Sequence, residues 1–153
     1  MLDISVLRMK DFSKSIVVSQ ESIVYNEKPF YMGDYRTLLA YQKSFALAMR
    51  IHHLTKKIPT EEKFGLISQI RNSSRSVCVN IVEAYKRRRY KDYYISKLND
   101  SETENAETQV WLDFSLACKY FTEEEYHELK SDNDQVAKLV LYMINNPDKF
   151  TIN

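Results

Sequence analysis

Apolar and aromatic side chains recur at helical spacing in four stretches between residues 34 and 146. In the first stretch they are Leu38, Tyr41, Phe45, Met49 and His52. In the second they are Phe64, Ile67, Ile70, Val77, Ile81 and Ala84, and in the fourth Tyr126, Leu129, Val136, Val140 and Met143. Positions three, four and seven apart share one face of an α-helix. With short connections, the pattern predicts an all-α, antiparallel, up-down-up-down four-helix bundle at residues 34–146.

Helix-capping residues mark the expected ends of these helices. Side chains that accept hydrogen bonds from free amide groups precede the first three: Asp34, Thr60 and Asp92. Pro59 ends the first helix, and the third is expected to run to about Tyr120. Thr122 and Glu125 have the spacing of a capping box at the start of the fourth helix, which residues 145–147 end.

Residues 1–33 and 147–153 fall outside the helical pattern. Short apolar pairs alternate with polar residues in SIVVSQESIVYNE, without helical periodicity. This pattern predicts an irregular or extended N-terminal arm with one short strand, and the alternative is a loosely held tail. The last seven residues are expected to form a C-terminal tail.

The third helix has an unusual window, NDSETENAETQ at residues 99–109, which lacks large apolar side chains. Bundle helices need an apolar stripe, so the window predicts a partly buried polar network between the second and third helices. Its expected members are Gln69, Ser76, Asn80, Glu83, Ser101, Glu104 and Glu107. Buried carboxylates need cations, which Arg71 or Arg75 would supply, so Glu104→Gln is expected to destabilise the fold. The alternative is that the window faces water.

The composition is that of a helical protein without membrane spans. Among 153 residues there are 2 Gly and 3 Pro, and the net charge is +1. No apolar run approaches the ~20 residues that a membrane helix needs. The N-terminus lacks a secretory leader pattern, so we expect a cytoplasmic protein in which Cys78 and Cys118 are reduced packing residues.

Charges are segregated along the chain. Seven cations lie between residues 71 and 91 against one Glu, whereas eleven acids lie between residues 100 and 134 against two Lys. Cations beside tyrosines can bind phosphates and stack on unpaired bases. The candidate nucleic-acid-binding residues are therefore Arg71, Arg75, Lys86, Arg87, Arg88, Arg89, Lys91 and Tyr90. The alternatives are a solvated helix end or contacts between basic and acidic surfaces of neighbouring subunits.

Catalytic and metal-binding patterns are weak in this sequence. Glu124 and His127 have a di-iron-like spacing, but a ferritin-type site needs that spacing on two helices. A carboxylate metal site of Glu83, Glu104 and Glu107 is a remote alternative without histidines. The sequence contains no glycine-rich phosphate loop, so we expect neither enzymatic activity nor a cofactor.

Three motifs carry a resemblance to a known family. The second helix begins with a Pro-x-x-Glu-x-x-Gly-Leu-x-x-Gln pattern, here Pro59, Glu62, Gly65, Leu66 and Gln69. A Ser-x-x-x-Asn-Ile-x-Glu element follows at Ser76, Asn80, Ile81 and Glu83, and the third helix matches at Ser101, Glu104, Glu107, Thr108, Trp111 and Leu112. Over residues 35–146 the chain resembles the bacterial four-helix-bundle family that includes proteins encoded within 23S ribosomal RNA genes. It departs from the family pattern at Asn72-Ser73 and at Ala84.

The resemblance implies a ring, typically a homopentamer, without established enzymatic activity. A related group of bundles serves as accessory proteins of reverse transcriptases in diversity-generating retroelements. We therefore expect a non-catalytic homo-oligomeric adaptor that binds RNA or DNA, or alternatively a scaffold that docks an enzyme such as a reverse transcriptase. More aromatic groups than the inner stripes can bury also favour subunit contacts: Tyr41, Tyr85, Tyr93, Tyr94, Phe114, Tyr120 and Tyr142.

Overall fold

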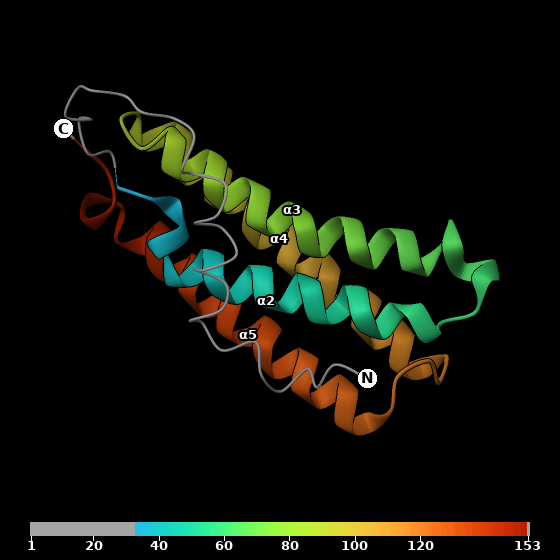
Figure 1. Ribbon diagram of the computed structural model, residues 1–153. Helices are drawn as coiled ribbons and strands as arrows, with labels where there is room; N and C mark the ends of the chain where they lie inside the picture. Colours follow the sequence, from blue (N-terminus) through green and yellow to red (C-terminus); the bar gives the residue numbers. More distant parts are fainter. Residues whose placement is uncertain (1–32, 153) are drawn as a thin grey trace, which may run out of the picture. The chain divides into compact units, whose positions relative to one another are not determined.

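Four long helices with short connections make up residues 33–152, the part of the chain that the computed structural model describes (Figure 1). The helices are α2 (Leu39–Leu54), α3 (Leu66–Lys86), α4 (Lys91–Ala117) and α5 (Glu123–Asn145). Four 3-10 turns flank them: η2 (Tyr35–Thr37), η3 (Thr55–Lys57), η4 (Thr60–Lys63) and η5 (Pro147–Lys149). Consecutive helices run in opposite directions, and residues 33–152 contain no strand, so the predicted all-α bundle is confirmed. The predicted N-terminal arm lies outside the described residues.

The inward faces of the four helices form one apolar core. Its fully buried members include Ile51, Ile70, Ile81, Leu98, Leu112, Leu129, Val136 and Val140. Burial of each such side chain contributes about 1.5–3 kcal/mol. Tyr94, at the start of α4, is also fully buried, and its hydroxyl has no hydrogen-bond partner among the described residues. Burial raises the pKa of this phenol far above its usual value.

The start of α3 differs from the sequence prediction. Thr60 begins the short η4 turn, whereas α3 begins at Leu66, six positions later. The Leu66 amide donates to Oε2 of Glu62 at 3.1 Å, so this carboxylate caps the helix. A Cβ on Gly65 would lie 2.8 Å from the same oxygen, so a larger residue here would displace the Glu62 carboxylate from this cap. Phe64, predicted on the inner stripe, precedes the helix and is 86% exposed.

The predicted capping box at the start of α5 is confirmed. The Thr122 amide donates to Oε2 of Glu125 at 2.9 Å, and the Glu125 amide donates to Oγ1 of Thr122 at 3.2 Å. Burial alone would raise the pKa of the Glu125 carboxyl, but hydrogen bonds from Lys57 and Thr122 outweigh burial and lower it. The Lys57 contact also ties α5 to the turn that follows α2.

Helices α3 and α4 approach each other over more positions than any other pair of helices. Small polar side chains occupy their contact and are buried: Ser73, Ser101 and Thr108. Ser101 Oγ donates to the Val77 carbonyl at 3.1 Å, and the hydroxyls of Thr108 and Ser73 lie 2.9 Å apart. Two residues of the window without large apolar side chains, Ser101 and Thr108, therefore form direct contacts with α3.

The C-terminal residues pack against the start of α4. The Phe150 ring stacks on Tyr94 with 6.4 Å between ring centroids, and the Ile152 amide donates to the Arg88 carbonyl at 3.2 Å. These contacts attach the C-terminal residues to the turn between α3 and α4. No helix in residues 33–152 is both long and apolar enough to cross a membrane.

Candidate nucleic-acid interface

The turn between α3 and α4 carries the cation run of the sequence. We call residues 86–91 the basic corner. The Arg87 amide donates to the Glu83 and Ala84 carbonyls and ends α3, and the Tyr90 amide donates to the Arg87 carbonyl and closes the turn. This tight turn leaves three cations exposed that form none of the ion pairs of residues 33–152: Lys86, Arg87 and Arg89.

Arg88 points inward and differs from its neighbours in the basic corner. It is 7% exposed, its Nη1 donates to the Tyr85 carbonyl at 2.7 Å, and its guanidinium lies 3.8 Å from the centroid of the Tyr85 ring. These contacts leave its charge facing the protein. Arg88 is therefore a structural residue of the turn, which corrects its assignment to the nucleic-acid-binding set.

Two tyrosines present exposed rings beside these cations. Tyr90 is 64% exposed and Tyr93 60% exposed, and their ring centroids lie 6.4 Å apart. The Arg87 guanidinium lies 5.8 Å from the centroid of the Tyr93 ring. Lys91 pairs with Asp148 at 2.8 Å, an exposed ion pair of the kind that contributes only about 0–1 kcal/mol. The corner thus combines exposed cations with aromatic faces, as nucleic-acid-binding surfaces do.

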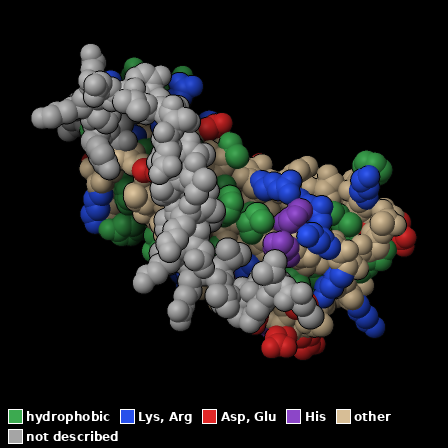
Figure 2. All heavy atoms as spheres, in the orientation of Figure 1, with side chains coloured by type: hydrophobic (Ala, Val, Ile, Leu, Met, Phe, Trp, Pro, Cys, Tyr) green, Lys and Arg blue, Asp and Glu red, His purple; other side chains and the backbone are tan. Residues whose placement is uncertain are grey.

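Arg71 and Arg75 lie apart from the basic corner. Arg75 precedes Lys86 by eleven positions on α3, which corresponds to roughly 16 Å along the helix axis. Both arginines instead face the end of α2, where Arg71 donates to Thr55 Oγ1 at 2.8 Å. Figure 2 shows Lys and Arg side chains gathered around the two histidines on this face. The predicted basic surface is therefore divided into two regions.

The predicted polar network between α3 and α4 is formed by different residues. Of its expected members Ser101 is buried, whereas Gln69, Glu83 and Glu107 are exposed. Glu83 pairs with Lys97 at 2.8 Å, and Glu107 accepts from the Trp111 indole at 3.0 Å. The three remaining members are half-buried: Ser76, Asn80 and Glu104. The buried hydroxyl of α3 that meets α4 belongs to Ser73, next to the predicted row, and none of the ion pairs of residues 33–152 joins Arg71 to a carboxylate.

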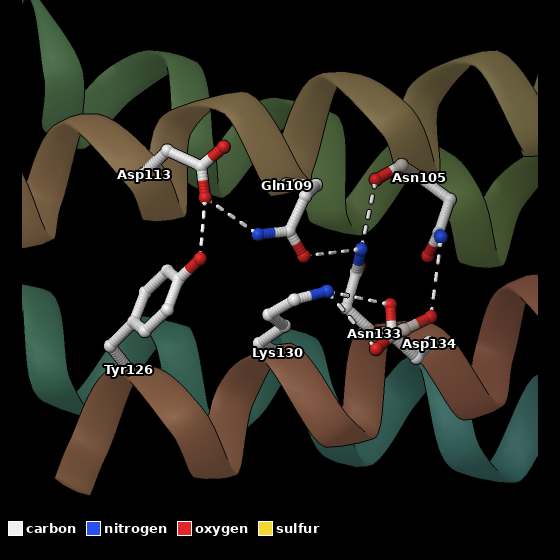
Figure 3. A network of polar contacts seen from close by, with 7 residues as sticks. All are labelled: Asn105, Gln109, Asp113, Tyr126, Lys130, Asn133 and Asp134. Carbon is white, nitrogen blue, oxygen red and sulfur yellow. Dashed lines mark hydrogen bonds and ion pairs between the residues drawn. The ribbon is translucent and has the colours of Figure 1, made fainter. Parts of the chain in front are cut away.

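A second polar network joins α4 and α5 (Figure 3). Asn105 Nδ2 donates to the Asn133 carbonyl at 3.3 Å, and Asn133 Nδ2 donates back to the Asn105 carbonyl at 3.2 Å. Asn133 Nδ2 also lies 3.4 Å from Gln109 Oε1, and Gln109 Nε2 donates to Asp113 at 2.7 Å. Asp113 accepts from the Tyr126 hydroxyl at 2.8 Å. The chain of contacts runs from the buried asparagines to solvent.

The two asparagines were not predicted from the sequence, although their helical phase signals their burial. Asn105 lies between Ser101 and Leu112 at steps of four and seven, and all three are buried. Asn133 continues the Leu129, Val136 and Val140 stripe of α5 in the same way. A polar residue at a position of the buried helical stripe was therefore the signal from which the burial of each asparagine could have been predicted.

Glu104→Gln is expected to leave the fold intact and to stabilise it slightly at pH 7. Partial burial raises the pKa of the Glu104 carboxyl, and the charges of Glu107 and Asp100 raise it further. A carboxyl with a raised pKa opposes folding while ionised, and this effect disappears as the pH falls below its usual pKa of 4.5. Relief of like-charge repulsion is worth about 0.2–0.5 kcal/mol. This expectation reverses the one drawn from the sequence.

Urea denaturation at pH 7 and pH 4 checks the direction of the Glu104 effect. Glu102→Gln on the same helix is the matched control and should show a smaller change. A clear loss of stability in Glu104→Gln at pH 7 would contradict the repulsion and support the buried network expected from the sequence.

A metal centre finds no support among the described residues. No group of three or more His, Cys, Asp or Glu side chains within residues 33–152 is placed to hold a metal ion. His127 lies at the start of α5 and packs its ring on Tyr126, with 5.3 Å between ring centroids. Of the three carboxylates considered as a metal site, Glu83 pairs with Lys97, Glu107 accepts from the Trp111 indole, and Glu104 is half-buried.

Comparisons with known proteins agree on one family. The family model of the 23S rRNA-intervening sequence protein matches residues 36–142. A crystal structure of a protein of unknown function from the S23 ribosomal protein family of Bacteroides thetaiotaomicron is 32% identical in sequence, with a TM-score of 0.65. This match covers 71% of the present chain and 96% of the Bacteroides chain. Curated proteins gave no match.

Proposed function

This chain belongs to the 23S rRNA-intervening sequence protein family, and on that premise we propose that it is a non-catalytic, homo-oligomeric adaptor that binds nucleic acid. The observation that carries the proposal is the basic corner. Lys86, Arg87 and Arg89 are exposed there beside the open rings of Tyr90 and Tyr93. The ribosomal RNA context in the names of the family and of the Bacteroides relative supports RNA as the first ligand to test.

The chemistry of the corner favours unpaired nucleotides. Cations bind phosphates of any sequence, and tyrosine rings stack on any base that is free of its helix. We therefore infer binding that depends strongly on salt and weakly on sequence.

Apolar surface outside the core supports assembly. A groove of about 430 Å³ between α2 and α3 is lined mainly by apolar and aromatic side chains, among them Tyr41, Phe45 and Val79. Val110 and Phe114 on α4 are about half exposed. Two unlike surfaces on one subunit can meet in a heterologous contact, and such contacts close into rings. The family resemblance implies a five-fold ring. Such a ring would carry one basic corner on each subunit, so that several weak contacts with one nucleic-acid strand would add up to a higher affinity.

Protein docking is the second candidate function, and the acidic surface favours it. Glu123, Glu124 and Glu128 on α5 are exposed, and nucleic acid is repelled by such a surface. The resemblance to retroelement accessory proteins makes a reverse transcriptase the partner to test. Co-purification from the native host that survives nuclease treatment would support direct docking, and its loss would support the nucleic-acid role.

Neutralising the basic corner is expected to weaken binding of a single-stranded RNA by about ten-fold or more. The variant combines Lys86→Gln, Arg87→Gln and Arg89→Gln, and spares Arg88 because that side chain is structural. Each phosphate contact contributes about 0.7 to the slope of log affinity against log salt for single strands, so the slope should fall by about two. Fluorescence anisotropy at several salt concentrations measures both quantities.

A variant with the same charge change elsewhere is the control for the corner. It carries three substitutions of exposed lysines: Lys43→Gln, Lys119→Gln and Lys138→Gln. The proposal fails if the unmodified protein does not bind RNA or DNA strands at low salt, or if both variants lose the same affinity. Light scattering on the same preparations should give several times the 18.1 kDa of one chain.

A further inference from the structure

Basic side chains from three elements converge where α2 ends. We call His52, His53, Lys56, Arg71 and Arg75 the α2–α3 cation cluster. Arg71 Nη2 donates to the His52 carbonyl at 3.4 Å, and Arg75 Nη2 lies 3.4 Å from His52 Nδ1. Lys56 follows on η3, and the rings of His52 and His53 have 5.5 Å between their centroids. The view of this face shows the two histidines bordered by Lys and Arg side chains (Figure 2).

The cluster lacks the carboxylates that pair with Arg50 on α2 and with Lys57 on η3. Arg50 pairs with Glu128 and Asp132, and Lys57 pairs with Glu125, so the α5 acids that face this end of α2 are already engaged. None of the ion pairs of residues 33–152 involves a cation of the cluster. An uncompensated group of like charges attracts anions to its surface.

The contact between Arg75 and His52 fixes the state of the imidazole. A guanidinium has donors only, so His52 Nδ1 must accept and the ring proton lies on Nε2. Burial lowers the pKa of His52, and Arg71, Lys56, Arg75 and His53 lower it further. If the ring gains a second proton, Nδ1–H and the Arg75 donor face each other without an acceptor. An oxyanion between them would satisfy both groups.

A structural role explains only part of this arrangement. Arg71 satisfies the carbonyl of His52 in the last turn of α2, where cations are favourable, and its Nε is held by Thr55. Arg75 and Lys56 have no such backbone partner among the described residues. Arg75 contacts the His52 ring, but neither Arg75 nor Lys56 is paired with a carboxylate within residues 33–152, so an anion bound here would offset their repulsion.

We propose that His52, Arg71 and Arg75 form a proton-coupled oxyanion site that holds a phosphate group. Arginine binds phosphate through paired N–H donors, and protonated His52 adds a third donor and a charge. The site extends the proposed function. The identification of its ligand as a phosphate of a nucleic-acid backbone rests on that function. It is separate from the basic corner and gives the adaptor a second contact whose strength rises as the pH falls.

The first test follows the three histidine rings of the full chain by NMR as the pH is varied. Sulfate, which does not titrate between pH 5 and 8, is compared with chloride at equal ionic strength. The titration midpoint of His52 should rise in sulfate, whereas that of His127 on α5, which packs on Tyr126 and is not part of the cluster, should stay unchanged. Arg75→Gln should abolish the response, and Arg89→Gln in the basic corner should leave it intact.

The second test measures binding of a thymidine homopolymer strand, whose bases do not titrate in this range. Between pH 7.5 and pH 5.5 the affinity should rise about three-fold or more, because one protonation is coupled to binding. His52→Gln should remove this dependence, and circular dichroism will show whether the variant is folded.

The two tests separate the site from the proposed function. A His52 midpoint that ignores sulfate, or that responds equally in Arg75→Gln, overturns the site even if the strand binds. A specific sulfate response without strand binding supports the site as one for free phosphate and contradicts the nucleic-acid role. Strand binding with no dependence on pH overturns the coupling to His52.

Discussion

Asn133→Asp is expected to lower the free energy of unfolding by about 3–5 kcal/mol at pH 7, the range for a buried charge without a partner. Asn133 is buried, and its Nδ2 donates to the Asn105 carbonyl and to Gln109 Oε1. An aspartate would replace this donor with an acceptor and place a charge against both oxygens. The Lys130 ammonium in the same network is already paired with Asp134 (Figure 3).

Urea denaturation across pH gives the sign of the Asn133→Asp effect. A buried carboxyl has a raised pKa, so its destabilisation is present at high pH and diminishes as the pH falls and the group takes up a proton. Asn72→Asp at an exposed position of α3 is the control and should change stability by less than about 0.5 kcal/mol. Equal losses in the two variants would show that the asparagine pair is not a determinant of stability.

Ser101→Leu should destabilise the fold by about 2–4 kcal/mol, because overpacking a close contact forces helices apart. Ser101 is fully buried where α3 and α4 approach each other, and its hydroxyl donates to the Val77 carbonyl. A leucine would need space that the neighbouring backbone fills, and it would also remove the hydrogen bond. Thermal or urea denaturation measures the loss.

Two variants separate the effects of size and polarity at this contact. Ser101→Ala keeps the small volume and should lose only the hydrogen bond, about 1 kcal/mol. Ser96→Leu makes the same change at an exposed position of α4 and should have little effect. If Ser101→Leu is as stable as Ser101→Ala, the two helices are not held close by small side chains.

The four helices could be predicted because the spacing of their apolar residues is a local signal, but only the start of α5 was predicted with the correct cap. Asp34 caps η2 rather than α2, and Asp92 lies inside α4, which begins at Lys91 without a side-chain cap. The capping box of Thr122 and Glu125 depends on residues three positions apart, and both hydrogen bonds are present. The start of α3 was predicted wrongly at Thr60, since the true cap needs the Glu62 side chain to fold over Gly65. That contact depends on backbone geometry that a residue pattern does not contain.

The candidate site was harder to predict, because its residues are distinguished by small rotations of a helix. The row predicted to be buried on α3 lies beside Ser73, whose hydroxyl meets Thr108 of α4 in the structure. Spacing alone assigns a side chain to a face of a helix but does not say which neighbour that face meets. Arg88 shows the same limit, since a run of four cations gave no indication that one of them turns inward.

The close contact of α3 and α4 also bears on the order of folding. These helices are consecutive in the chain, and only Arg87–Tyr90 connects them. Contacts between them therefore close short segments of chain, and they outnumber those of any other helix pair. Short loops lose little entropy on closure, and chains rich in local contacts fold fast. We infer that this helical hairpin forms early and that α2 and α5 dock on it afterwards. The amide groups of α3 and α4 should then be the last to exchange with solvent deuterium, and those of α2 the first among the long helices.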